Sequence, residues 1–110
     1  MTRIYRVVVR GQFDGLDDVT RERLLAEAPE HDIFRSAFTA DGTFTYDTRL
    51  VAFNLRYETR VPDSATEDGG DPKAAAVEQA LERAATSLTS VGLGHTHLRA
   101  TAADMAEMWR

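Results

Sequence analysis

In VAFNLRYETRV, residues 51–61, apolar residues alternate with polar and charged ones. The apolar set is Val51, Phe53, Leu55, Tyr57 and Val61, and the opposite set is Asn54, Arg56, Glu58 and Arg60. Successive side chains of a β-strand point to opposite faces of the sheet. The stretch therefore predicts a long strand with one face packed on a core and the other face open.

Two further stretches repeat this alternation. Residues 3–13 place Tyr5, Val7, Val9 and Phe13 opposite Arg6, Arg10 and Gln12. Residues 94–101 place Leu98 and Ala100 opposite His95, His97 and Arg99. Because the formal net charge of the chain is -5, a face rich in Arg and His stands out as the expected working surface.

Two stretches have the signals of helices. Asp17 or Asp18 is a suitable N-cap for a helix that runs to about Ala28, with Pro29 fixing its end. A second helix is expected over about residues 72–91, since Pro72 suits a first turn and Gly92 suits the position after the last turn. Its expected apolar stripe consists of Val77, Leu81, Ala84, Leu88 and Val91.

The order of these segments predicts an α+β fold. Residues 33–39 and 43–47 flank Asp41-Gly42, a strong hairpin signal. The expected order is β-α-β-β-β-α-β, a ferredoxin-like sandwich with a mostly antiparallel sheet, two helices on one face and a short C-terminal helix within residues 102–109. Residues 33–39 are either an extra edge strand or part of one bent strand over residues 33–47.

Composition narrows the class of protein. A chain of 110 residues is expected to form a single domain, with an acidic mobile loop at about residues 62–72. The absence of cysteine excludes disulfides, thiolate metal sites and a Cys nucleophile. With no apolar leader and no long apolar stretch, the protein is expected to be cytoplasmic and not to bind membranes.

The arginines and histidines of the open face form the candidate site. In a ferredoxin-like sheet the first, long central and last strands are neighbours, so their polar side chains would converge. Guanidinium groups bind carboxylates and phosphates through paired hydrogen bonds. We therefore expect an anion-binding site built from Arg6, Arg10, Arg56, Arg60, His95, His97 and Arg99. A solvated or subunit-contact face is the alternative. Nucleic acid is not expected as a partner, because Phe53 and Tyr57 fall on the apolar side.

His95 and His97 also raise the possibility of an enzyme. Two residues apart on a strand, the imidazoles would leave the same face and could share a metal, with Glu58 or His31 as a third ligand. The neighbouring arginines would repel a dication, so no metal, cofactor or catalytic residue is predicted. An enzyme using His95 and His97 with Glu58 remains an alternative. Another is an adaptor that pairs with a partner through residues 33–39.

Several segments resemble those of a known family. They are residues 10–16, 30–32 and 37–47, together with the ending Ala103-Asp104-Met105-Ala106-Glu107-Met108-Trp109. On these segments the chain is similar to a family of small actinobacterial proteins described as a domain of unknown function. The resemblance implies a cytosolic actinobacterial setting, and it brings no activity, cofactor or functional residue.

The expected function is therefore non-catalytic. The protein would form a homodimer, bind an anionic metabolite on the Arg/His face, or do both. The homodimer rests on analogy with other one-sided sheets and on the apolar side chains Met105, Met108 and Trp109 near the C-terminus.

Overall fold

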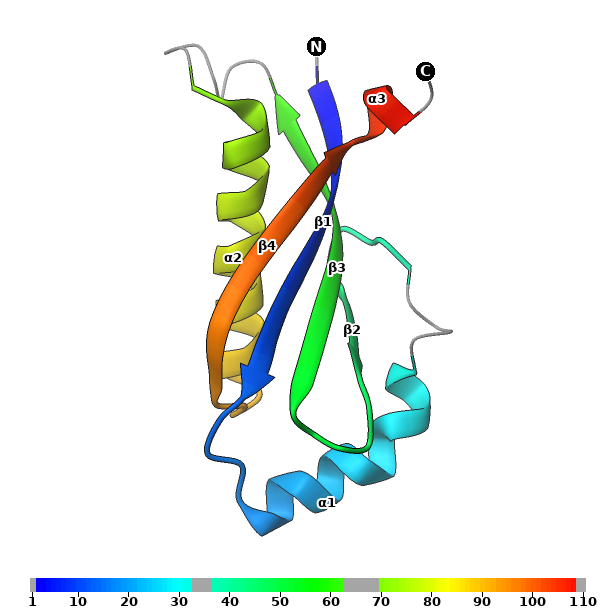
Figure 1. Cartoon of the computed structure of the whole chain (residues 1–110), viewed down its shortest axis with the longest axis vertical. Coiled ribbons are helices and arrows are strands. Elements are labelled where there is room, and N and C mark those ends of the chain that lie inside the picture. Colours follow the sequence, from blue (N-terminus) through cyan, green and yellow to red (C-terminus); the bar gives the residue numbers. More distant parts are fainter. Residues whose placement is uncertain (1, 33–36, 63–69, 109–110) are drawn as a thin grey trace.

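The computed structural model describes residues 2–32, 37–62 and 70–108. Its elements follow the order β1 (Thr2–Phe13), α1 (Asp18–Glu27), η1 (Ala28–His31), β2 (Thr43–Tyr46), β3 (Ala52–Pro62), α2 (Pro72–Ser90), β4 (His95–Asp104) and α3 (Met105–Met108). The strands form one antiparallel sheet in the order β2-β3-β1-β4 (Figure 1). The α+β class is confirmed.

The predicted five-strand order is wrong, because four strands form the described sheet. Residues 33–36 of the expected extra strand lie outside the described residues. The described remainder adds only an isolated parallel bridge between Thr39 and Tyr57. The chain then turns at Gly42, whose amide donates to the Thr39 carbonyl at 3.3 Å, and enters β2. Residues 37–47 are therefore a turn and one short strand.

Helix α2 covers one face of the sheet, whereas α1 lies across the sheet end at which β1 finishes (Figure 1). The prediction of two helices on one face is therefore wrong. Only Leu24 of α1 is buried, and Val19 is 76% exposed. A helix without an apolar stripe cannot cover a sheet face. Helix α2 has such a stripe, formed by Ala76, Ala80, Ala84 and Leu88.

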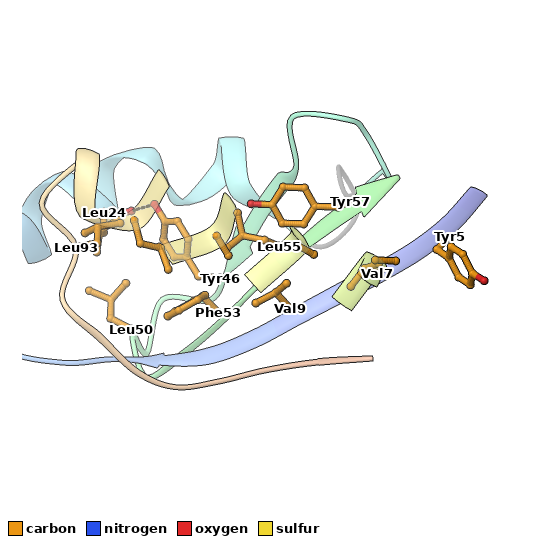
Figure 2. Close-up of a cluster of buried hydrophobic side chains, with 14 of the residues drawn as sticks. Tyr5, Val7, Val9, Leu24, Tyr46, Leu50, Phe53, Leu55, Tyr57 and Leu93 are labelled. Atoms are coloured by element: carbon orange, nitrogen blue, oxygen red, sulfur yellow. Dashed lines mark hydrogen bonds between the residues drawn. The ribbon is translucent and has the colours of Figure 1, made fainter. Parts of the chain in front are cut away.

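The core lies between α2 and the apolar side of the central strands (Figure 2). The alternation predicted for residues 3–13 and 51–61 is confirmed for Tyr5, Val7, Val9, Phe53, Leu55, Tyr57 and Val61, which are all buried. Val51 is an exception at 57% exposure, because β3 begins one residue later. Leu50, with a positive φ of 55°, turns into the core in its place.

Helix α1 is attached to the sheet by aromatic side chains at the end of β2. The buried Tyr46 hydroxyl donates to the Leu24 carbonyl at 2.7 Å (Figure 2). The His31 ring stacks on Tyr46, with 5.1 Å between the ring centroids. These contacts hold α1 and η1 against the edge of the sheet. Burial raises the pKa of Tyr46, so its phenol stays protonated and keeps donating at neutral pH.

The last strand is longer than the sequence indicated. It continues to Asp104, where Ala102 pairs with Val7 and Asp104 with Tyr5, so the C-terminal helix begins at Met105 rather than at Ala102. A short C-terminal helix is nevertheless confirmed. Seven residues of the expected acidic loop, 63–69, lie outside the described residues. Within the described residues, no helix is both long and apolar enough to cross a membrane.

Candidate functional site

The open side of the sheet gathers the predicted arginines from three neighbouring strands. Directly paired residues of antiparallel strands share a face. The register pairs Val8 with Arg56 and Arg6 with Glu58 across β1 and β3, and it pairs Arg10 with Arg99 across β1 and β4. Arg60 lies opposite Ile4. The open side of these strands thus carries Arg6, Arg10, Arg56, Arg60 and Arg99, against Glu58 as its acid.

One register row of this face crosses all four strands and is the most polar. It consists of Thr45 on β2, Asn54 on β3, Arg10 on β1 and Arg99 on β4. The buried Thr45 hydroxyl donates to the Asn54 side-chain oxygen at 2.5 Å. This bond turns the Asn54 amide nitrogen, a donor, away from Thr45. The Arg10 guanidinium leans toward β4 and donates to the Thr101 hydroxyl at 3.4 Å.

A pocket of about 880 Å³ lies along this row. Arg10, Gln12, Thr45, Asn54 and Arg99 contribute to its lining from the strands. Helix α1 and η1 supply an apolar wall of Leu25, Ala28 and Pro29. The volume lies within the range of about 300–1,000 Å³ that is typical of small-molecule sites, as is an apolar wall with a few converging polar groups.

Two acids also line the pocket, Asp32 and Asp47. Asp47 is neutralised locally, because Arg49 Nε and Nη2 both donate to its Oδ2, at 3.1 and 3.0 Å. The hydrogen bond from Arg49 lowers the pKa of the Asp47 carboxyl, which stays ionised and paired. The charged groups that the strands themselves contribute to the pocket are Arg10 and Arg99.

A second group of arginines lies farther along the same face. Arg6 and Arg56 are diagonal neighbours on β1 and β3, and both are partly buried. The Arg6 Cζ lies 5.1 Å from the centroid of the Phe38 ring, a cation–π contact. Nε of Arg6 and Nη1 of Arg56 are buried and have no hydrogen-bond partner among the described residues. The Glu58 carboxylate lies 4.0 Å from Arg60 Nη2.

The prediction that His95 and His97 both lie on the open face is wrong for His95. The register shifts between Arg10 and Gln12, so His97 and Leu98 form a β-bulge opposite Gly11, and His97 has a positive φ of 57°. On the far side of the bulge, His95 pairs with Phe13 and lies on the helix-covered side. Its Nδ1 lies 3.1 Å from the Leu93 carbonyl oxygen.

The other expected partners of these histidines also lie apart. Glu58 pairs with Arg6 toward the other end of the sheet, and His31 stacks on Tyr46 with its Nδ1 2.9 Å from the Phe44 carbonyl oxygen. Among the described residues, no group of three His, Asp or Glu side chains is arranged to hold a metal ion. The described part of the proposed adaptor edge is already engaged, since the Glu58 amide donates to the Thr39 carbonyl at 2.8 Å.

Sequence reasoning missed the uncharged half of the site and its cover. Gln12 and Asn54 stand on the predicted polar side, so their alternation was a usable signal for a role beside the arginines. The wall of Leu25, Ala28 and Pro29 had no such signal, because the crossing of α1 over the sheet end depends on the Tyr46–Leu24 contact. The approach of Phe38 to Arg6 likewise depends on tertiary structure.

Comparisons with known proteins place the chain in a family but give it no activity. No curated protein and no solved structure matches it. One family model matches residues 1–109, nearly the whole chain. The chain therefore belongs to DUF6204, a family of unknown function.

Proposed function

We propose that this protein binds a small organic anion in the pocket beside Arg10 and Arg99. The observation that carries the proposal is the direct pairing of these two arginines beside the donors Asn54 and Gln12 in one pocket. Two guanidinium groups can each offer two parallel N–H donors to a carboxylate or phosphate. The apolar wall of α1 and η1 suits the hydrocarbon part of such a ligand.

The role is binding rather than catalysis. The polar groups that line the strand side are guanidinium, amide and hydroxyl groups, which orient and neutralise an anion. General acid–base catalysis needs a group that exchanges protons near the working pH. Arg49 donates to the Asp47 carboxylate and holds it ionised. The proposed setting is the cytoplasm, where small carboxylates and phosphates are abundant.

We also propose a homodimer, but the charge of the open face argues against a dimer contact through that face. A two-fold contact brings the same patch of both subunits together. It would oppose the arginines of one subunit to those of the other, with Glu58 as the strand acid available for pairing. Light scattering tests the dimer, and a monomeric mass would remove it.

We also propose that the fold is a variant of the ferredoxin-like plan. The element order β-α-β-β-α-β supports this relationship. The position of α1 across the end of the sheet is the departure from the plan, and it is this departure that gives the pocket its apolar wall.

Isothermal titration with a panel of small carboxylates and with inorganic phosphate tests the binding proposal. We expect at least one anion to bind, and Arg99→Gln to weaken it by about tenfold, the effect of losing one charged hydrogen-bond pair. Arg60→Gln is the matched control, since Arg60 shares the face but lies outside the pocket. Equal affinities for wild type and Arg99→Gln would exclude this site.

A further inference from the structure

We infer that the open face holds a second oxyanion subsite at Arg6 and Arg56, so that the ligand carries an anionic group at each end. This inference rests on the proposed function and extends it from any small anion to an elongated dianion. It draws on a different observation from the pocket itself, the buried and unpartnered nitrogens of these two arginines.

The unpartnered nitrogens show that each guanidinium is partly desolvated without an acceptor, which favours pairing of its accessible N–H groups with an anion. A buried donor without an acceptor has lost its water without compensation. This applies to Nε of Arg6 and to Nη1 of Arg56 among the described residues. A partly desolvated guanidinium interacts more strongly with an incoming oxyanion than a fully hydrated one, because the local dielectric is lower.

The geometry lets the two side chains act together. Arg56 pairs with Val8, two residues along β1 from Arg6, which makes Arg6 and Arg56 diagonal neighbours within reach of one another's long side chains. Phe38 covers one face of the Arg6 guanidinium. Stacking on a ring leaves the in-plane N–H groups to donate, and it keeps the guanidinium from swinging freely.

One strand acid, Glu58, lies beside this pair. Glu58 lies directly opposite Arg6 in the register, but its carboxylate is paired with Arg60 at 4.0 Å. This end of the face carries three arginines, Arg6, Arg56 and Arg60, and one acid, Glu58. Positive charge is therefore in excess there. The chain as a whole is acidic, with a formal net charge of -5, so the excess is local.

The spacing of the two subsites defines the ligand. Arg10 lies two residues along the sheet from the row of Arg56 and four residues from Arg6. At about 3.3 Å per residue, the two subsites are about 10 Å apart. Val8 lies between them on the same face, partly buried, and offers an apolar contact to a hydrocarbon spacer. The class of ligand is therefore an extended molecule with a carboxylate or phosphate at each end.

Suberate, octanoate and succinate distinguish a two-headed ligand from a single anion. Suberate has two carboxylates on an extended chain, octanoate has the same chain with one carboxylate, and succinate has two carboxylates on a short chain. By isothermal titration we expect suberate to bind at least about tenfold more tightly than either, since a second charged hydrogen-bond pair is worth that factor or more.

Variants assign the second carboxylate to its subsite. Arg56→Gln is expected to reduce the affinity for suberate by about tenfold and to leave octanoate within about twofold. Arg99→Gln should lower the affinity for both suberate and octanoate, whereas Arg60→Gln should change neither affinity. Circular dichroism and thermal unfolding check that each variant is folded.

Two results would overturn the inference. One is equal binding of suberate and octanoate, both dependent on Arg99, which would leave the proposed function standing with a single subsite. The other is no binding of suberate at all. In that case octanoate and inorganic phosphate decide the proposed function separately, because either one needs only the Arg10 and Arg99 pair.

Discussion

Arg10 on β1 and Arg99 on β4 are directly opposite each other in the register, so two like charges face one another across neighbouring strands. Such a pair destabilises a sheet by about 0.2–1 kcal/mol. Nothing in the packing of β1 against β4 requires it, because both side chains are exposed. A repulsive pair in a pocket is typical of a site in which stability has been exchanged for binding.

Arg99→Gln is therefore expected to stabilise the fold while it weakens anion binding. The free energy of unfolding should rise by about 0.2–1 kcal/mol at low ionic strength, and the gain should shrink as salt screens the wild-type repulsion. Urea unfolding at low and high salt measures both effects. Arg60→Gln serves as the control, since Arg60 faces Ile4 and lies near Glu58. A variant less stable than wild type at low salt would contradict the expectation.

Gly42 is expected to be indispensable to the turn before β2. It has a positive φ of 87°, and an added Cβ would lie 2.6 Å from Cζ of the Tyr57 ring. Gly42→Ala should lower the free energy of unfolding by about 2–4 kcal/mol, because backbone strain and overpacking add. Gly15 is the matched control, because it also has a positive φ, of 65°, but an added Cβ there would have no atom within 4 Å. Gly15→Ala should therefore lower the free energy of unfolding by only about 1 kcal/mol. Equal losses in thermal unfolding would mean that the Tyr57 contact does not matter.

Alternation in the sequence was sufficient to predict most of the strand side of the core and the arginines of the charged face. Val7 and Leu55 are buried and Arg10 and Arg99 lie on the open side, because a strand's own period of two decides the face of each residue. The prediction failed at His95, where a bulge opposite Gly11 shifts the period by one residue. Gly11 packs closely against Phe53 and Leu98, a tertiary contact that the local pattern does not contain.

The position of the first helix could not be predicted in the same way. A cap at Asp17 or Asp18 and an end near Ala28 were readable from local signals, and the structure has Asp17 as the N-cap. Where α1 lies depends on one buried hydrogen bond, from Tyr46 to the Leu24 carbonyl, between residues 22 positions apart. The apolar wall of the pocket follows from that placement, so the arginines of the site were predictable and their enclosure was not.

The start of α1 is expected to weaken in acid. The Thr20 amide donates to the Asp17 carboxylate at 2.7 Å. Hydrogen bonding from the Thr20 side chain, and then from its amide, lowers the pKa of Asp17. The pKa of Asp17 is lower in the folded protein than in the unfolded chain. The stability that the ionised Asp17 cap contributes is therefore present above about pH 4, and it is lost as the pH falls through the lowered pKa. Asp17→Asn keeps a good cap without the titrating group. The thermal stability of Asp17→Asn should decline less toward low pH than that of wild type. Parallel declines would mean that groups other than Asp17 cause the acid sensitivity.

Two buried threonines should respond in opposite directions to the same change. Thr59 and Thr45 are 3% and 2% exposed. The Thr59 hydroxyl has no partner among the described residues, whereas the Thr45 hydroxyl donates to Asn54. Valine has nearly the shape of threonine without the hydroxyl. Thr59→Val should therefore raise the free energy of unfolding by about 1 kcal/mol, and Thr45→Val should lower it by about 1–2 kcal/mol.

Urea unfolding of the two variants measures these changes, and anion titration separates their meaning. Because Asn54 lies in the pocket, Thr45→Val should also weaken anion binding, through loss of the bond that orients the amide. Thr59→Val should leave the affinity unchanged, since Thr59 pairs with Tyr5 on the helix-covered side. If both variants lost stability but kept full affinity, Thr45 would be a structural residue only, and the orientation of Asn54 would have no part in the site.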